Sequence, residues 1–337
     1  MTIKIGINGF GRIGRSIFRA IQKNPAFKDV SVVAINDPVP KATLIHLLKY
    51  DSVMGVFAGE VAENEKGFSC NGKNVAIFGL REPEKIPWGD HGAEFVIEST
   101  GFFVKKDDAG AHMKGGAKRV IISAPATGDV KTMVVGVNEH EFNPAEHFVV
   151  SNASCTTNCL APFAKVIHEK FGIECGLMTT THAYTGDQKL VDSPHSDLRR
   201  ARTAGVSMIP TKTGAAAAIG LVMPDLKGRF DGLAVRVPTP NVSLVDAVMT
   251  VKKAAADVKE VNNALRQAAD NKILGYTDEP LVSIDFQGDP RSSIVDGGCT
   301  KVIGGGHTIK VMSWYDNEWG YSNRVVDLIL HMKKVAG

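Results

Sequence analysis

The stretch that decides the fold lies near the start of the chain and reads Ile3-Lys-Ile-Gly-Ile-Asn8-Gly9-Phe-Gly11-Arg-Ile-Gly14. Ile3 to Asn8 has the apolar pattern of a buried strand, and apolar residues then recur at helical spacing beyond Gly14. Gly9 and Gly11 let the backbone approach a pyrophosphate, while Gly14 lets the helix pack closely on the strand. The helix N-terminus then faces the anion. The stretch therefore predicts a strand, a glycine turn and a helix that bind a dinucleotide.

An acidic residue follows at the distance that this motif requires. The apolar segment Val30–Asn36 predicts a second strand, and Asp37 comes directly after it. This agrees with the roughly 20 residues expected before an acid that hydrogen-bonds the adenosine ribose. The charge of Asp37 would repel a 2′-phosphate, so NAD is expected rather than NADP. The alternative is an ordinary turn aspartate before Pro38.

Further strands with helices or loops between them are expected in the first half of the chain. The segments are Phe95–Glu98, Val120–Ser123, Met133–Val137 and His147–Val150. Such alternation is typical of a doubly wound parallel sheet of the Rossmann type. Residues 99–101 and 123–125 follow predicted strands, at the edge where such sheets bind ligands. Turn chemistry explains these two segments nearly as well.

A cysteine is expected at the start of a helix in the middle of the chain. Residues 151–162 read Ser-Asn-Ala-Ser-Cys-Thr-Thr-Asn-Cys-Leu-Ala-Pro, with helical apolar spacing after them and Gly172 as the stop. Ser154 and Thr156 are the predicted caps, which leaves Cys155 at the positive end of the helix dipole. Such a position lowers a thiol pKa and is typical of a nucleophile. The alternatives are a buried thiol that only packs and, with Cys159, a metal or redox pair; an inert Cys159 is preferred.

A histidine and several cations form the remaining candidate site. The predicted strand Gly176–Thr181 leads to His182, 27 residues after the cysteine, as a possible base for it. The polar stretch between Tyr184 and Pro210 is too long for an ordinary connection, and its arginines are phosphate ligands or a salt-bridge cluster. Thr213-Gly214 is predicted to open an alanine-rich helix and so to form another anion site. Arg236 lies in the predicted strand Phe230–Val237.

The second half of the chain is expected to be a mostly antiparallel α+β domain. The further strand-like segments are Val242–Val251, Leu281–Phe286 and Thr308–Trp314, with a helix at Val258–Ala269. A final amphipathic helix, Trp319–Lys334, is expected to return to the nucleotide domain. The predicted domains are therefore residues 1–154 completed by 319–337, which bind NAD, and residues 155–318, which carry the catalytic and substrate residues.

Composition narrows the class of protein and its partners. Lys+Arg 39 against Asp+Glu 36 in 337 residues gives a net charge of +3, too small and dispersed to indicate nucleic acid as the main partner. The five cysteines form no secreted-type disulfide framework, which indicates a reducing compartment such as the cytoplasm. Neither a signal peptide nor a membrane span is expected. No metal site is expected either.

These residues together closely resemble the phosphorylating glyceraldehyde-3-phosphate dehydrogenase family over the whole chain. The resemblance rests on the stretch around Cys155, on Thr-His-Ala-Tyr-Thr around His182, and on Asp-Leu-Arg-Arg-Ala-Arg, Thr-Gly-Ala-Ala and Arg-Val-Pro-Thr. It also rests on Trp-Tyr-Asp-Asn-Glu-Trp-Gly-Tyr-Ser near the end. The fold, the cofactor and the site that this family implies are the expectations that follow.

By this resemblance Cys155 is the nucleophile and His182 its activating base. The residues implied in NAD binding are Gly9, Gly11, Arg12, Ile13, Asp37, Arg81, Ser123, Asn317 and Tyr321. Those implied in binding the substrate phosphate are Thr185 and Arg236, and those implied for inorganic phosphate are Ser154, Thr156, Arg200, Thr213 and Gly214.

The expected activity is the oxidation of D-glyceraldehyde 3-phosphate with NAD and phosphate to 1,3-bisphosphoglycerate, in a homotetramer. One alternative is a non-phosphorylating sugar-phosphate dehydrogenase of the erythrose-4-phosphate type. Another is a nucleotide-responsive RNA-binding protein on the same fold, although nothing in the sequence supports RNA binding.

Overall fold

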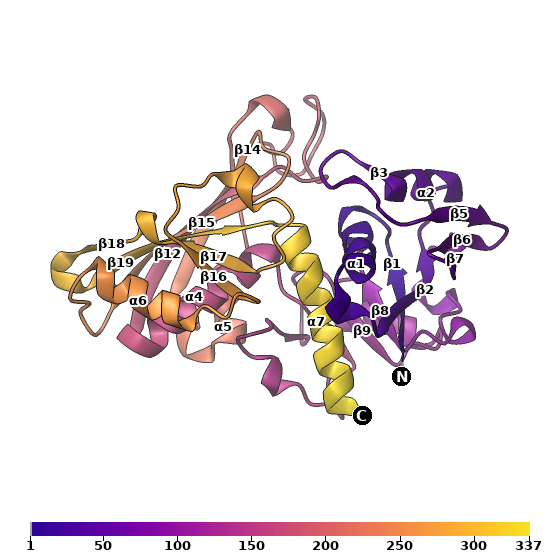
Figure 1. Ribbon diagram of the computed structural model, residues 1–337, viewed down its shortest axis with the longest axis horizontal. Helices are drawn as coiled ribbons and strands as arrows, with labels where there is room; N and C mark the ends of the chain where they lie inside the picture. Colours follow the sequence, from indigo (N-terminus) through magenta and orange to yellow (C-terminus); the bar gives the residue numbers. More distant parts are fainter. Residues whose placement is uncertain (1) are drawn as a thin grey trace. The chain divides into compact units, whose positions relative to one another are not determined.

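The computed structural model describes residues 2–337 and divides the chain into two compact units (Figure 1). The first contains the residues up to Met133 together with Glu139–Ala153 and Ser322–Gly337. The second contains Val134–Asn138 and Ser154–Tyr321. The domain boundaries predicted above, after residues 154 and 318, stay a prediction.

The first unit is built on a nine-stranded sheet with the order β10-β11-β9-β8-β1-β2-β7-β6-β5. The strands are β1 (Ile3–Asn8), β2 (Val30–Asn36), β5 (Val61–Asn64), β6 (Gly67–Cys70), β7 (Lys73–Phe78), β8 (Phe95–Glu98), β9 (Arg119–Ile122), β10 (Lys131–Thr132) and β11 (Val149–Ser151). Every pairing from β10 to β7 is parallel, and β6 and β5 add an antiparallel edge. A small hairpin, β3 (Tyr50–Asp51) with β4 (Gly55–Val56), stands apart from this sheet. The helices are α1 (Arg12–Lys23), α2 (Lys41–Lys49), α3 (Lys106–Gly110) and most of α7 (Trp319–Ala336).

The predicted opening of the chain forms as expected. In β1, Ile5 and Ile7 are completely buried between β2 and β8, and Ile17 of α1 is buried as well. Gly9 has φ +88°, a left-handed conformation that favours glycine. A Cβ added to Gly14 would lie 2.2 Å from the carbonyl oxygen of Gly9, so only glycine allows the helix to start this close to the turn.

The second unit is built on an eight-stranded, mostly antiparallel sheet, with the main order β13-β14-β12-β15-β19-β17-β16. The strands are β12 (Ile173–Ala183), β13 (Ile209–Lys212), β14 (Phe230–Val237), β15 (Ser243–Val251), β16 (Leu274–Thr277), β17 (Ser293–Asp296), β18 (Lys301–Ile303) and β19 (Thr308–Tyr315). Only β12 with β14 and β16 with β17 pair in parallel. Together with the parallel sheet of the first unit, this confirms the predicted fold class.

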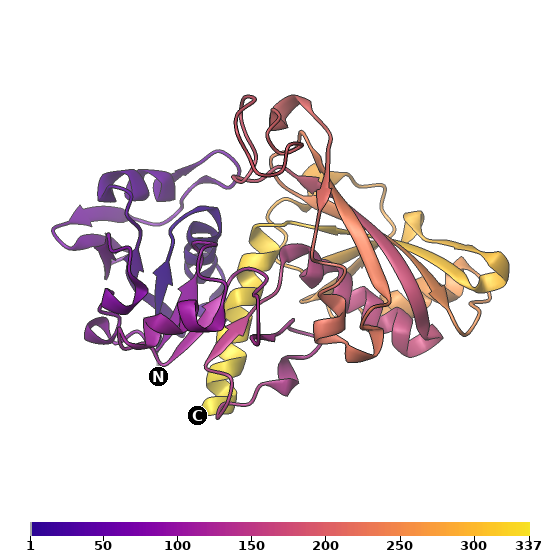
Figure 2. The same cartoon turned by 180° about the vertical axis from the view of Figure 1, so that it is seen from behind.

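Helices in the second unit pack on one side of this sheet. They are α4 (Cys155–Phe171), α5 (Ile219–Val222) and α6 (Val258–Ala268), and α4 contacts β15, β17, β19 and α6. The sheet is seen from behind in Figure 2. Alternate residues of β12, β14 and β15, namely Leu177, Leu233 and Val248, are exposed. The sheet therefore buries one face under α4 and leaves apolar side chains on its other face.

Two predicted strands are wrong. Residues 133–137 turn instead, because Gly136 has φ +88° and the N–H of Val134 donates to the side chain of Asn138 at 2.8 Å. Residues 283–286 form a 3-10 helix, since the carboxylate of Asp285 accepts the N–H of Val282 at 2.8 Å. In both segments an apolar run resembles a strand, but a side-chain oxygen takes a backbone N–H and closes a turn.

Candidate active site

The start of α4 holds Cys155 in the position predicted for it. Ser154 has extended backbone angles (φ −102°, ψ 163°), and its hydroxyl accepts a hydrogen bond from the N–H of Thr157 at 3.0 Å. Gly172 ends the helix with φ 71°. The predicted cap at Ser154 and stop at Gly172 are therefore confirmed, and Cys155 is the first residue of the helix.

Thr156 is not a helix cap, contrary to the prediction. It lies within the first turn, and its hydroxyl is 2.9 Å from the hydroxyl of Tyr315. The Tyr315 hydroxyl is also 2.9 Å from that of Thr180, so this buried phenol connects α4 with β12. Tyr315 is not among the predicted site residues; its place at the end of a strand in the Trp-Tyr-Asp-Asn motif is the signal in the sequence that points to it.

The end of β12 brings His182 to the cysteine. Its Nε2 lies 3.5 Å from the Sγ of Cys155, and its Nδ1 lies 2.7 Å from the carbonyl oxygen of Ala183. Because a carbonyl can only accept, Nδ1 carries the proton and donates it, which leaves the lone pair of Nε2 toward the sulfur. This tautomer can take a proton from the thiol or from a substrate hydroxyl.

The charges around the pair act in opposite directions on its two members. Burial raises the pKa of the Cys155 thiol, whereas the guanidinium of Arg236 and hydrogen bonds from Thr156 act to lower it. The predicted lowering by the helix start is thus outweighed, because a buried thiolate loses its water. Burial and Arg236 lower the pKa of His182 to about 3. The imidazole is therefore neutral at physiological pH and can accept a proton.

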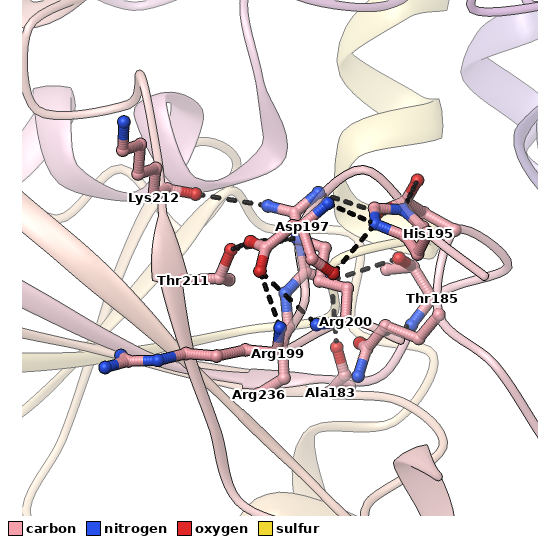
Figure 3. A network of polar contacts seen from close by, with 11 residues as sticks. Ala183, Thr185, His195, Asp197, Arg199, Arg200, Thr211, Lys212 and Arg236 are labelled. Atoms are coloured by element: carbon pink, nitrogen blue, oxygen red, sulfur yellow. Dashed lines mark hydrogen bonds and ion pairs between the residues drawn. The ribbon is translucent and has the colours of Figure 1, made fainter. Parts of the chain in front are cut away.

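Arg236 lies near Cys155 and His182, and it contacts the hydroxyl of Thr185. Its Nη1 donates to the hydroxyl of Thr185 at 3.1 Å and to the carbonyl of Ala183 at 3.3 Å (Figure 3). Its Nε is buried and has no hydrogen-bond partner among residues 2–337. Burial lowers the pKa of Arg236, and the nearby Cys155 acts to raise it. A guanidinium and a hydroxyl so close to the sulfur suit the phosphate of a small substrate.

Arg200 is already engaged by protein groups. Its nitrogens donate to the carboxylate of Asp187 at 2.6 Å, the hydroxyl of Thr211 at 2.9 Å and the carbonyl of Lys212 at 3.2 Å (Figure 3). Burial acts to raise the pKa of Asp187, but hydrogen bonds from His195 and Arg200 lower it overall. The predicted contact of Arg200 with inorganic phosphate therefore requires it to leave or share these partners.

The predicted helix start at Thr213 and Gly214 is wrong. The hydroxyl of Thr213 accepts the N–H of Ala215 at 3.2 Å, and the alanines after it form turns. Helix α5 begins only at Ile219. A hydroxyl that takes a backbone N–H competes with helix formation. Any anion at Thr213 and Gly214 would therefore meet a turn rather than a helix N-terminus.

Within the first unit, the glycine turn borders a cavity of about 470 Å³ at the carboxyl ends of the parallel strands. Its lining residues are Asn8, Gly9, Gly11, Asn36, Asp37, Pro38, Leu80, Arg81, Ser99, Thr100, Phe102 and Phe103. A Cβ added to Gly11 would meet no atom of the described residues within 4 Å. The space in front of this backbone thus fits a pyrophosphate at the start of α1.

Asp37 connects the second strand to the glycine turn. Its carboxylate accepts the N–H of Phe10 at 2.8 Å and the N–H of Val39 at 3.0 Å. These contacts hold the carboxylate at the wall of the cavity, where a ribose hydroxyl could donate to it. The charge is therefore well placed to discriminate against a 2′-phosphate.

The other predicted cofactor residues have the following surroundings. Arg12 pairs with Asp51 at 2.6 Å, Ile13 is half-buried, and Arg81 is exposed at the cavity wall. Ser123 donates to Ser99 at 2.9 Å but does not line the cavity. Asn317 and Tyr321 belong to the second unit, where Asn317 accepts from Ser243 at 2.8 Å and Tyr321 is buried. Their part in NAD binding stays a prediction.

Two segments of the chain match models of one protein family. Residues 3–106 match the family model described as glyceraldehyde 3-phosphate dehydrogenase, NAD binding domain. Residues 154–317 match the C-terminal domain of the same enzyme. The chain belongs to the glyceraldehyde-3-phosphate dehydrogenase family. The predicted family is therefore confirmed, and so is NAD as its cofactor.

Relatives agree with this membership of the glyceraldehyde-3-phosphate dehydrogenase family. Glyceraldehyde-3-phosphate dehydrogenase of Geobacillus stearothermophilus is 55% identical over 98% of each chain. Glyceraldehyde-3-phosphate dehydrogenase 1 of Bacillus cereus is 57% identical, again over 98% of each chain. The enzyme of Streptomyces coelicolor is 52% identical over 97% of this chain and 98% of its own.

Three further features of residues 2–337 concern metal ligands, membrane-spanning helices and Cys159. Residues 2–337 contain no group of three or more His, Cys, Asp or Glu side chains that could hold a metal ion. In the same range, no helix has the length and apolar character needed to cross a membrane. Cys159 is buried, and burial raises its thiol pKa to about 12. This favours an inert Cys159 over a second reactive thiol.

Proposed function

We propose that this chain catalyses the NAD- and phosphate-dependent oxidation of D-glyceraldehyde 3-phosphate to 1,3-bisphosphoglycerate. The observation that carries the proposal is the 3.5 Å contact between Cys155 Sγ and His182 Nε2. Membership of the family and the names of the relatives support it.

The first step is addition of Cys155 to the aldehyde. The lone pair on Nε2 of His182 takes the thiol proton as the sulfur attacks the carbonyl carbon, and the proton then passes to the new alkoxide. The product is a hemithioacetal on Cys155. Arg236 and Thr185 hold the phosphate of the substrate, which fixes the carbonyl next to the sulfur and makes the attack effectively intramolecular.

The second step is oxidation to a thioester. His182 takes the proton of the hemithioacetal hydroxyl, and such general base catalysis contributes about 10²- to 10⁴-fold. Bound NAD would supply the acceptor for the hydride of the same carbon. The residues proposed to hold it are those of the glycine turn, with Asp37 at its ribose.

The third step releases the product. Inorganic phosphate attacks the thioester carbon, the bond from carbon to Sγ breaks, and His182 returns a proton to the sulfur. We assign the attacking phosphate to Ser154, Thr156, Arg200, Thr213 and Gly214. Because Arg200 donates to Asp187 at 2.6 Å in this structure, phosphate has to compete with that carboxylate.

The test is to mix the purified protein with NAD and glyceraldehyde 3-phosphate, with and without inorganic phosphate, and to follow the absorbance of reduced nicotinamide. Sustained reduction that requires phosphate is expected. Without phosphate we expect one burst equal to the number of sites, because the thioester is trapped. Fast turnover without phosphate would favour a hydrolytic sugar-phosphate dehydrogenase, and no reduction would overturn the proposal.

The oligomeric state and cellular location are part of the same proposal. Large apolar side chains are exposed on the segment after His182, namely Leu190, Val191, Leu198, Val206 and Met208. Exposed apolar patches are typical of subunit interfaces, which supports a homotetramer. All five cysteines are free thiols, which supports the cytoplasm as the location.

A further inference from the structure

A buried polar cluster lies beneath the cavity of the first unit and has no part in the mechanism above. It consists of Asn8 (2% exposed), Glu98 (1%) and His112 (0%). Trp88, which is also completely buried, contacts His112. A carboxylate in such a place is costly unless hydrogen bonds satisfy it. The contacts of Glu98 must therefore supply hydrogen bonds to its carboxylate.

Every oxygen lone pair of Glu98 that points into the protein has a donor. Oε2 accepts from the side-chain amide of Asn8 at 2.6 Å and from Nε2 of His112 at 3.0 Å. Oε1 accepts from the N–H of Thr100 at 2.8 Å and also from its hydroxyl. The carboxylate of Glu98, at the end of β8, thus connects Asn8 at the end of β1, Thr100 after β8 and His112.

Trp88 fixes the direction of this network. Its indole N–H lies 3.0 Å from Nδ1 of His112. An indole nitrogen can only donate, so Nδ1 accepts and the ring proton lies on Nε2, where it donates to Glu98. The imidazole is therefore held at both nitrogens, with a single tautomer that suits a carboxylate partner.

The other end of the network reaches the cavity wall. Asn8 and Thr100 both line the cavity, whereas Glu98 and His112 do not. The side-chain oxygen of Asn8 accepts from Asn36 at 2.8 Å, and Asn36 lines the cavity as well. A Cβ on Gly9 would lie 2.7 Å from the backbone nitrogen of Thr100, so Thr100 directly abuts the glycine turn. A shift of Thr100 would therefore move the surface that faces the cofactor.

We infer that Glu98 and His112 are positioning residues for the dinucleotide: they set the places of Asn8 and Thr100 without touching the cofactor. This inference rests on the proposed use of the cavity for NAD. A pair that only stabilises the core would, when changed, lower the melting temperature and leave the affinity of the folded protein for NAD unaltered. A positioning pair changes that affinity.

Glu98→Gln is the sharpest change. Glutamine has the same shape as glutamate, but its amide has an NH₂ group in place of one oxygen. In one orientation this NH₂ group faces the N–H and hydroxyl of Thr100, and in the other it faces the N–H groups of Asn8 and His112. We expect the Kd for NAD to rise about tenfold, which corresponds to one buried donor pair left unsatisfied. With saturating NAD, kcat should change by less than about twofold, because Cys155 and His182 belong to the other unit.

The experiment is calorimetric titration of the full-length wild type, Glu98→Gln and His112→Gln with NAD, together with circular dichroism to establish that each is folded. His147→Gln is the matched control: its Nδ1 also accepts an N–H, in this case the backbone N–H of Asn143 at 2.9 Å. His147 precedes β11 and so lies at the amino ends of the parallel strands, whereas the cavity lies at their carboxyl ends. The control should bind NAD like the wild type.

A double-mutant cycle separates positioning from general damage. If Glu98 acts through Thr100, Glu98→Gln should weaken NAD binding less in a Thr100→Val background than in the wild type. Glu98→Asp, which keeps the charge but withdraws the carboxylate, serves if Glu98→Gln does not fold. Wild-type affinity in the folded Glu98 and His112 variants would overturn the inference, whereas a wild type that does not bind NAD would overturn the proposed function instead.

Discussion

His182 and Arg236 are paired residues on the neighbouring parallel strands β12 and β14. This register gives His182, the proposed general base, a cation as its neighbour. Burial and the guanidinium of Arg236 together lower the imidazole pKa of His182 to about 3. Burial raises the thiol pKa of Cys155, and the guanidinium acts to lower it. One strand pairing thus places a cation that adds to the effect of burial on His182 and opposes the effect of burial on Cys155.

Arg236→Gln should therefore make Cys155 less reactive. Loss of the cation removes a group that lowers the thiol pKa, so the thiolate fraction at a given pH falls and the pH midpoint of alkylation moves upward. The measurement is the rate of Cys155 alkylation by iodoacetamide against pH. For turnover, the lost phosphate contact should reduce kcat/KM for the substrate by roughly 10- to 100-fold.

The control for that change is Arg266→Gln, which removes an arginine that is exposed and pairs with Asp278. It should leave both the alkylation profile and kcat/KM unchanged. A midpoint that stays in place or moves downward in Arg236→Gln would contradict the electrostatic role of Arg236.

Cys155→Ala should abolish turnover, and His182→Asn should keep NAD binding but lose about two to four orders of magnitude in kcat. The reason is that Nε2 of His182, the proposed base, lies 3.5 Å from the sulfur. Steady-state kinetics with a parallel NAD titration checks both. Cys175→Ala, at an exposed thiol, is the control, and near-normal activity of either site variant would remove its assigned role.

The parts of the fold that could be predicted are those with a local cause. Strands β1, β2 and β8 have the predicted limits because most of their residues are apolar and turn residues bound them. Helix α4 begins and ends as predicted because a serine cap and a left-handed glycine act within one turn of the chain. These features depend on few distant contacts.

The wrong predictions depend on side-chain contacts that the spacing of apolar residues along the sequence does not indicate. The hydroxyl of Thr156 faces Tyr315, which is 159 residues away, rather than the helix terminus. Val134 and Val282 lie in apolar runs, but a nearby Asn or Asp side chain takes the backbone N–H that a strand would have used. Burial likewise raises the thiol pKa of Cys155, a cost that the helix start alone does not indicate. The sequence thus indicated that Cys155 and His182 would lie together, but it did not indicate the electrostatic effect of their burial.

Asp37→Asn should weaken the preference for NAD over NADP. Each carboxylate oxygen accepts one N–H, Oδ2 from Phe10 and Oδ1 from Val39, so the amide keeps only one of these two contacts. It also no longer repels a 2′-phosphate. The ratio of kcat/KM for NAD to that for NADP should fall by about tenfold or more, as expected for the loss of one charge contact. Asp29→Asn, which changes an exposed carboxylate in the same unit, should leave the ratio unchanged. An unaltered ratio in Asp37→Asn would mean that Asp37 is only a turn residue.

Gly11→Ala and Gly14→Ala form a matched pair, with the same methyl group added three residues apart. At Gly14 the methyl would lie 2.2 Å from the Gly9 carbonyl oxygen, so α1 has to move and the free energy of unfolding should fall by about 1–3 kcal/mol or more. At Gly11 the methyl meets no described atom within 4 Å, so the free energy of unfolding should change by less than about 1 kcal/mol. The same methyl would occupy the space proposed for the pyrophosphate, and we expect the Kd for NAD to rise at least about tenfold. Denaturant unfolding and NAD titration of both variants measure the two effects separately; tight NAD binding by a stable Gly11→Ala protein would place the pyrophosphate elsewhere.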